Sequence, residues 1–298
     1  MILNKSMRTL FATLFVIGTL CCAQPSSAQQ ANKIDPVALV RRATQNEIAA
    51  TGVTKAPFFM YKDHTQYRDH SITTQAIETP EGGLNRTIAK NGKPLSPEEQ
   101  SAADQKLKSF AYDKEARRKK RQSNREDDQR SITLMRSLPD AFDYTVTGVT
   151  KGQNGHEMVR LSFKAKPGWT APTRETRPLE GMDGNMVIDQ TAGRIAEING
   201  ELFKDVDFGW GILGRLNKGG KFVIHQAEVG EGKWEETQER LQFDGKILVF
   251  KNLTIDSNET MSDFRPVPSN ISTAQALQLL ENPAEVVAQS GGPTSGKQ

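Results

Sequence analysis

The chain has 298 residues, and its 39 Lys+Arg nearly balance its 36 Asp+Glu, which gives a formal net charge of +3. This balance excludes a global electrostatic drive toward nucleic acid or a membrane surface. A mean hydropathy of −0.57 predicts a modest core with long polar segments.

The first 28 residues have the order of parts found in a secretory signal peptide. Lys5 and Arg8 precede the apolar run 10–23, and a polar stretch of small residues leads to Ala28, after which we expect cleavage. No later apolar run reaches ~18 residues, so no membrane span is expected in the mature chain. Both cysteines lie in this segment, and a mature chain without thiols fits the bacterial periplasm or a secreted location.

Residues 34–52 are predicted to form a helix. Asp35 is suited to cap its N-terminus, Pro36 to occupy the first turn, and Gly52 to end it. Spacing by three and four predicts one apolar stripe on this helix, at Val37, Val40, Thr44 and Ile48. Two strands are predicted next, at 57–79 and 84–90, joined by the turn 80–83.

A charged helical insertion is predicted over residues 96–139. Ser96, Pro97 and Glu99 form a capping-box signal, and Pro139 is expected to stop the helix near Leu138. A basic run lies inside the insertion, at Arg117, Arg118, Lys119, Lys120 and Arg121. Because acids follow closely and no aromatic residues interleave, we interpret this run as a solvated helix face and expect no nucleic acid. The alternative is contact with an anionic membrane surface or an acidic partner.

From Phe142 onward the apolar period changes to two, which is typical of strands with one apolar and one polar face. The predicted strands lie near 142–147, 158–165, 184–190, 194–205, 220–229, 234–243 and 246–256. Short turns between them, such as Asp244-Gly245, indicate an antiparallel meander. The apolar face needs a cover, for which the N-terminal helix and part of the insertion are the candidates. A last helix is predicted from Ser272, with Gln275 as its box partner, before a flexible tail.

The connection 208–222 contains three glycines with the G-x-G-x-x-G spacing of a dinucleotide-binding turn, at Gly209, Gly211 and Gly214. Such a turn must lead into a helix whose N-terminus faces the pyrophosphate. Here two adjacent glycines follow too soon for a helix, and 221–229 is predicted as a strand, so a nucleotide is not expected. Two interpretations of the connection remain: core folded onto the sheet, or an apolar lip at a ligand or partner site.

The sequence contains no visible catalytic or metal-binding constellation. Four histidines are scattered along the chain without a ligand cluster, at His64, His70, His156 and His225. Nucleophile-elbow, zincin and phosphate-loop motifs are absent. The carboxylates follow helix-surface and strand-edge patterns. We therefore expect a non-catalytic protein without a metal or a cofactor.

Three stretches resemble the outer-membrane lipoprotein carrier superfamily, whose members are also called lipoprotein localisation factors. The strand, turn and return strand over 184–202 are similar to its G-x-x-x-I-D pattern, carried here by Gly184, Ile188, Asp189 and Ile195. The next stretch is similar to its W-x-P-T strand, carried by Trp234 and Thr237. Residues 261–265 resemble its terminal F-S-D-Y-R strand. The pattern looks most like an uncharacterised group of secreted bacterial proteins named for outer-membrane lipoprotein sorting.

The resemblance covers 140–265 well and 34–90 loosely, and the insertion departs from it. It implies an α+β, mainly β fold: a curved antiparallel half-barrel sheet covered by helices. We expect one such domain over 29–268, followed by a short helix and tail over 269–298.

The resemblance also implies a periplasmic, non-catalytic binding protein that holds a lipid or lipoprotein acyl chain on the concave apolar face. The residues expected to line or gate that face are Phe142, Tyr144, Val159, Leu161, Phe163, Trp210, Ile212, Leu213 and Phe222. The alternative is an envelope protein-interaction or sensor module that uses the same fold and offers the helical insertion to a protein partner.

Overall fold

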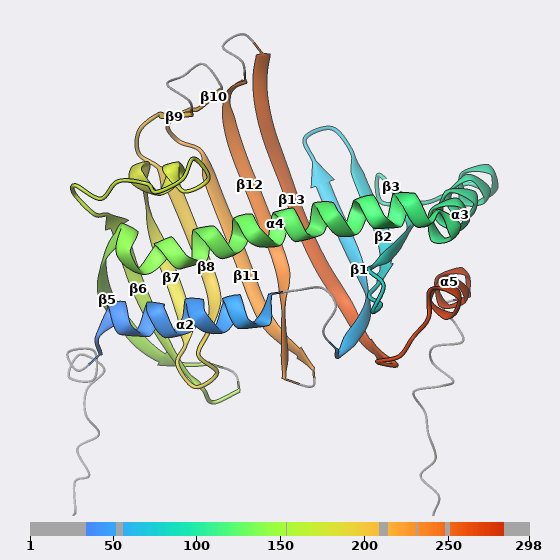
Figure 1. The fold of residues 1–298 in the computed structure, drawn as a ribbon, viewed down its shortest axis with the longest axis horizontal. Helices are drawn as coiled ribbons and strands as arrows, with labels where there is room; N and C mark the ends of the chain where they lie inside the picture. Colours follow the sequence, from blue (N-terminus) through green and yellow to red (C-terminus); the bar gives the residue numbers. More distant parts are fainter. Residues whose placement is uncertain are drawn as a thin grey trace, which may run out of the picture.

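The computed structural model describes residues 34–51, 56–152, 154–208, 214–230, 232–247 and 251–282. They form the α+β, mainly β fold that the sequence predicts. Thirteen strands make one antiparallel sheet that is not closed into a barrel, and two long helices, α2 and α4, lie across one of its faces (Figure 1). We call this the covered face and the opposite one the open face. The predicted signal peptide and C-terminal tail lie outside the described residues.

The strands follow the order β4-β3-β2-β1-β13-β12-β11-β8-β7-β6-β5, and the short strands β9 and β10 branch from β12. Most chain neighbours pair with each other, as in a meander, but β8 pairs with β11, and the N-terminal strand β1 pairs with the C-terminal strand β13. The strand bounds are β1 Phe58–Tyr67, β2 Ser71–Ile77, β3 Leu84–Lys90, β4 Lys93–Pro94, β5 Phe142–Lys151, β6 Glu157–Ala165, β7 Met182–Asp189, β8 Arg194–Leu202, β9 Val206–Phe208, β10 Gly214–Leu216, β11 Lys221–Gly230, β12 Lys233–Ile247 and β13 Lys251–Val267.

The helices bury two separate cores against this sheet. Their bounds are α2 Pro36–Ala50, α3 Pro97–Tyr112, α4 Lys114–Ala141 and α5 Thr273–Glu281, with a short 3₁₀ helix η1 at Arg177–Gly181. The larger core lies between α2, α4 and strands β5–β8, and includes Val40, Leu138, Leu161, Ile188 and Leu202. The smaller core lies between α3, α5 and strands β1–β3, and includes Met60, Ile77, Leu107 and Leu277. In the part of the chain that the structure describes, no helix combines the length and apolar character needed to cross a membrane.

Helix α2 begins as predicted but turns a different face to the sheet. The Asp35 side chain accepts hydrogen bonds from the backbone N–H groups of Val37 and Ala38, at 3.0 and 3.1 Å. The predicted stripe is wrong at Val37, which is 36% exposed, and the buried positions are Leu39, Val40, Ala43, Thr44 and Glu47. Glu47 is stable at a buried, sheet-facing position because the sheet supplies Arg194 as its partner.

The insertion consists of two helices. Ser96 and Glu99 form the predicted capping box of α3, and Asp113 then caps α4 by accepting from the Ala116 N–H at 2.9 Å. The expected stop at Pro139 is wrong, because α4 continues to Ala141. A proline in the last turn costs the helix one hydrogen bond, and Pro139 and Ala141 are buried in compensation.

Two predicted boundaries in the sheet are also wrong. Segment 57–79 is a hairpin, in which the Tyr67 N–H donates to the His70 carbonyl at 2.8 Å and the two rings stack with centroids 4.6 Å apart. This turn contains neither glycine nor proline, so the sequence pattern did not mark it. Asp244-Gly245 lies inside β12 rather than at a turn. The reason for a glycine there is the neighbouring strand β10, because a Cβ on Gly245 would lie 2.1 Å from the Arg215 carbonyl oxygen. The glycine there permits the close approach of β10.

Two glycines on neighbouring strands, Gly184 and Gly200, lie beside aromatic rings that pack in or against the larger core. Phe163, Gly184, Gly200 and Phe222 occupy one row across β6, β7, β8 and β11. A Cβ on Gly184 would lie 2.0 Å from the Asn199 carbonyl oxygen and 2.6 Å from the Phe163 ring. One on Gly200 would lie 2.6 Å from the Phe222 ring. The two glycines therefore leave the space that the two aromatic rings fill.

We predict that Gly184→Ala destabilises the protein by about 1–3 kcal/mol in urea unfolding, because the added methyl group meets backbone that cannot move aside. Gly148→Ala is the matched control, since no atom lies within 4 Å of its Cβ position. We expect the control to be within about 1 kcal/mol of wild type. Equal stability of the two variants would contradict this packing argument.

Candidate functional site

Most of the predicted lining residues form the core beneath the helices. Phe142, Val159, Leu161 and Phe163 are each at most 2% exposed, and the rings of Phe142 and Phe163 lie 4.6 Å apart. Tyr144 is half-buried, and its hydroxyl donates to the Leu138 carbonyl of α4 at 2.7 Å. Burial raises the pKa of this hydroxyl. A ligand in contact with these residues requires displacement of α2 and α4.

The remaining predicted residues have different positions. Phe222 is half-buried on the covered face, beside Gly200. Trp210, Ile212 and Leu213 lie outside the described residues, so the two interpretations of the connection 208–222 both remain predictions.

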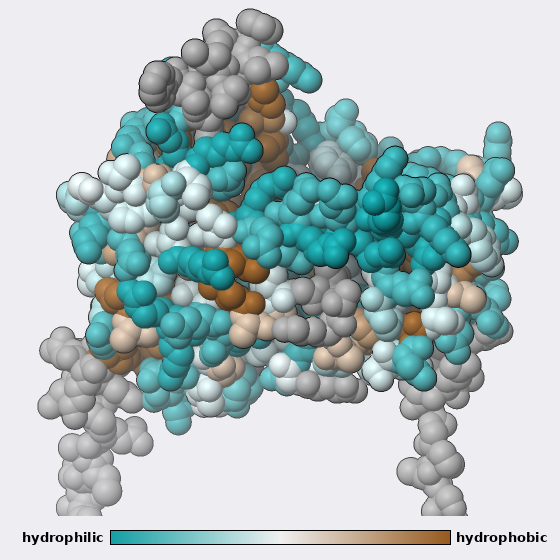
Figure 2. Space-filling view, in the orientation of Figure 1, coloured by the Kyte–Doolittle hydropathy of each residue, from teal (hydrophilic) through white to brown (hydrophobic). Residues whose placement is uncertain are grey.

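A strip of apolar side chains continues from the core onto the part of the covered face that no helix overlies. Strands β12 and β13 project beyond α4 (Figure 1), and hydrophobic residues gather over their projecting ends (Figure 2). Register places the strip on the covered face, because Phe222 lies opposite Leu241, Phe243 opposite Ile255, and Gly245 opposite both Leu216 and Leu253. The apolar strip comprises Leu216, Phe222, Leu241, Phe243, Ile247, Leu253 and Ile255, which are half-buried except for the exposed Ile247.

A polar cleft of about 550 Å³ occupies another part of the covered face. Helices α2 and α4, the start of β1 and the β11–β12 hairpin enclose it. Trp234 forms an aromatic part of the wall, and the Arg194 guanidinium lies 5.7 Å from the centre of its ring. The charged residues that line the cleft are Glu47, Glu78, Asp128, Arg194, Lys233, Glu235 and Glu236.

Both cations of the cleft already have carboxylate partners. Arg194 donates to the two oxygens of Glu47 at 3.0 and 2.7 Å, and the Ile195 N–H donates to the same carboxylate at 2.9 Å. Lys233 Nζ lies 2.7 Å from Glu78 and 2.7 Å from Glu235. Among the described residues, Asp128 and Glu236 have no such cationic partner. The cleft therefore has an excess of acidic groups.

Burial raises the pKa of both carboxyls. It raises the pKa of Glu236 to about 8, and the neighbouring Glu239, Glu259 and Glu235 contribute to the increase. Burial also raises the pKa of Asp128, with a smaller contribution from Asp127. At neutral pH the Glu236 carboxyl is therefore mostly protonated and carries no negative charge.

The acidic groups continue along the covered face beyond the cleft. Glu239 lies directly opposite Glu259 on β13, and the Glu259 and Asp63 carboxyls, on β13 and β1, share a side-chain hydrogen bond. Burial, followed by the charges of Asp63 and Glu239, raises the pKa of Glu259 to about 7. Burial also raises the pKa of Asp63 and of Glu239.

The sequence pattern did not reveal this cluster, because strict alternation places Glu236 and Glu239 on opposite faces of a strand. A β-bulge at Thr237 adds one residue to β12, so His225 pairs with Gln238 and Gln226 with Glu236. The bulge brings both glutamates to the covered face. The available signal was the density of acids in 234–239, next to a tryptophan.

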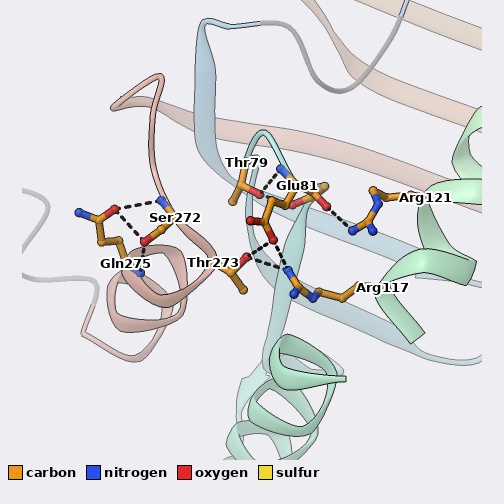
Figure 3. Close-up of polar contacts among 8 residues, drawn as sticks. Thr79, Glu81, Arg117, Arg121, Ser272, Thr273 and Gln275 are labelled. Atoms are coloured by element: carbon orange, nitrogen blue, oxygen red, sulfur yellow. Dashed lines mark hydrogen bonds and ion pairs between the residues drawn. The ribbon is translucent and has the colours of Figure 1, made fainter. Parts of the chain in front are cut away.

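The basic run of the insertion is divided between two faces of α4. The Arg117 guanidinium donates to the Glu81 carboxylate at 2.6 Å and to the Thr273 hydroxyl at 2.8 Å, and Arg121 donates to the Glu81 carbonyl at 3.0 Å (Figure 3). Arg118 pairs with Glu115 on the outer face, where Lys119 and Lys120 are exposed. Arg117 and Arg121 therefore join α4 to the β2–β3 turn and α5. Of the basic run, Arg118, Lys119 and Lys120 remain available for the alternative contact with an anionic membrane surface or an acidic partner.

Other polar residues also have partners within the fold. His156 lies 2.7 Å from Asp189, and Arg215 pairs with Asp207 at 2.7 Å and Asp205 at 3.4 Å. His64 contacts Thr73 at 2.8 Å. The structure brings no group of three or more His, Cys, Asp or Glu residues into metal-binding geometry within its described ranges.

Comparison with known proteins adds two distant likenesses. No protein-family model matches the chain, and no curated protein matches it. A DUF1329 family protein from Desulfovibrio piger is 12% identical, with 84% of this chain and 99% of that chain covered at a TM-score of 0.26. MucB, solved in complex with MucA(peri), is 8% identical, with 78% and 100% covered at a TM-score of 0.22. Likenesses at these TM-scores support no conclusion about how this chain works.

The raised pKa of Glu236 predicts a definite pH dependence of stability. Between the pKa of an unfolded glutamate, about 4.3, and the folded value, the native state holds a proton that the unfolded state has lost. The contribution of Glu236 to stability therefore falls as pH rises through this window. We predict that Glu236→Gln, which mimics the protonated form, raises stability at pH 8 by more than about 1 kcal/mol and flattens the decline.

Urea unfolding at pH 5.5, 7 and 8 measures this effect. Glu201→Gln is the control, because its carboxylate is on the surface and pairs with Lys221 at 3.1 Å. We expect the control to change stability by less than about 1 kcal/mol at every pH. A Glu236→Gln variant that is less stable than wild type at pH 8 would show that the carboxylate is compensated in the fold.

The two faces of α4 predict different effects of neighbouring arginines. Arg117→Ala removes the guanidinium hydrogen bonds to the Glu81 carboxylate and the Thr273 hydroxyl, and we expect a loss of about 1–3 kcal/mol in thermal or urea unfolding. Arg118→Ala removes an exposed pair and should change stability by less than about 0.5 kcal/mol. Similar losses in both variants would contradict the assigned division of the basic run.

Proposed function

We propose that the protein is an exported, non-catalytic binding protein that holds an acyl chain of a lipid or lipoprotein on the apolar strip. The observation that carries this proposal is the continuation of the core, as half-buried apolar side chains, onto a part of the covered face without a helix over it. The order of parts in the first 28 residues supports export, and the resemblance to lipoprotein carriers supports a periplasmic location.

The strip has dimensions suited to one chain. From Leu241 to Ile247, β12 extends for roughly 20 Å at about 3.3 Å per residue. One acyl chain spans half of a hydrocarbon layer that is about 30 Å thick, so it fits within this length. Each buried CH₂ contributes roughly 0.8 kcal/mol, so a chain against these side chains is bound with useful affinity.

The packed core restricts binding of the acyl chain to the apolar strip. Val159 and Leu161 are fully buried, and α4 is held at both ends, by Leu138 in the core and by Arg117 at Glu81. Binding on the strip requires no displacement of these contacts. We therefore assign the predicted apolar face two roles: its covered part stabilises the fold, and its uncovered part receives the ligand.

We predict that Ile247→Gln weakens binding of a fluorescent fatty acid by roughly fivefold or more, since a polar amide replaces the most exposed apolar group of the strip. Lys246→Gln is the matched control, because Lys246 precedes Ile247 in β12 and its side chain points to the opposite face of the sheet. Titration of probe fluorescence measures both affinities. Unchanged affinity in Ile247→Gln, or equal losses in both variants, would remove the strip from the site.

A further inference from the structure

We propose that the polar cleft is a second binding site, and that it takes a small organic cation with an ammonium or guanidinium group. The cleft shares no residue with the apolar strip, so this inference goes beyond the proposed acyl site. The polar cleft combines a volume of about 550 Å³, an aromatic wall and, among the described residues, two carboxyls without a cationic partner.

The volume and walls of the cleft suit a small molecule. About 550 Å³ lies within the range of roughly 300–1,000 Å³ that small-molecule sites occupy. Its walls come from three parts of the fold: Glu47 and Ala50 on α2, Asp128 on α4, and Trp234 on β12. Because the sheet and both long helices contribute, the folded core fixes the shape of the cleft.

The charges of the cleft select a cation. Arg194 and Lys233 use their donors on Glu47, Glu78 and Glu235, so they do not compensate further acids. Glu236 on the sheet and Asp128 on α4 line the same space. A ligand ammonium or guanidinium between them gains charge-assisted hydrogen bonds with these two half-buried carboxyls, whereas an anion or an acyl chain offers them no positive charge.

The aromatic wall adds to this selection. The Arg194 guanidinium already lies near the Trp234 ring, at 5.7 Å from its centre, so this indole already takes part in one cation–π contact within the cleft. A ligand cation placed against the same indole makes the same kind of contact.

Protonation gives the proposal a measurable signature. The charged groups around Glu236 are Lys233, Glu235 and Glu239 on its own strand, Glu259 on β13, and, from the other walls of the cleft, Asp128, Glu47, Glu78 and Arg194. Because burial, with a contribution from the charges of Glu239, Glu259 and Glu235, raises the pKa of Glu236 to about 8, the carboxyl holds a proton at pH 7 in the free protein. A cation that binds there favours the carboxylate, so binding at pH 7 releases a proton.

Isothermal titration calorimetry of the mature chain with spermidine tests the proposal, at about 0.15 M salt to suppress attraction to exposed acids. We expect saturable binding near one site per chain, and a heat that differs between Tris and phosphate buffers at pH 7 because a proton is released. Glu236→Gln and Asp128→Asn should each weaken binding roughly tenfold, and Glu236→Gln should also abolish the buffer dependence.

Two controls make the result specific to the cleft. Glu201→Gln removes a surface acid on the open face and should bind spermidine as wild type does. Circular dichroism and urea unfolding of each variant establish that it is folded. Absence of saturable heat at about 1 mM spermidine, or equal affinity of Glu236→Gln and wild type, overturns the proposal.

Discussion

A large open sheet with one apolar face must have that face covered, and this constraint determines the rest of the structure. Helices α2 and α4 satisfy it over strands β5–β8, where α2 is also fixed by the double hydrogen bond between Arg194 and Glu47. The two helices do not extend over the projecting ends of β12 and β13 (Figure 1). The apolar strip results from this incomplete cover, whereas the polar cleft lies where the two helices do reach the sheet but line it with charged side chains.

Helix α4 changes character along its length, and the two parts of the covered face change with it. Near its C-terminus, Leu138 and Ala141 are buried in the larger core. Nearer its N-terminus, Asp128 lines the cleft and Arg117 binds the Glu81 carboxylate. The helix is therefore a packing element at one end and the wall of a polar space in its middle. The half-buried carboxyls with raised pKa values, Asp128 and Glu236, line this polar space.

The sequence was sufficient to predict the local signals and the class of fold, but not the position of the site. Capping residues such as Asp35, Ser96 and Ser272 act within one turn, so their roles follow from neighbouring residues. Alternation from Phe142 onward indicated the strands and their apolar face. The bulge at Thr237 and the glycine approach at Gly245 depend on strands that are distant in sequence, so alternation alone could not predict them. The same is true of the core roles of Phe142 and Phe163, because apolar residues that pack under a helix and those that line a pocket share one pattern.

The most direct test of the account is mass spectrometry of a solvent extract from the mature protein, purified from a periplasm without detergent. The account predicts a lipid with acyl chains in a near-stoichiometric amount, and a smaller amount in a protein whose strip carries a polar residue. An extract without lipid, both after purification and after incubation of the protein with membranes, would contradict the role assigned to the apolar strip.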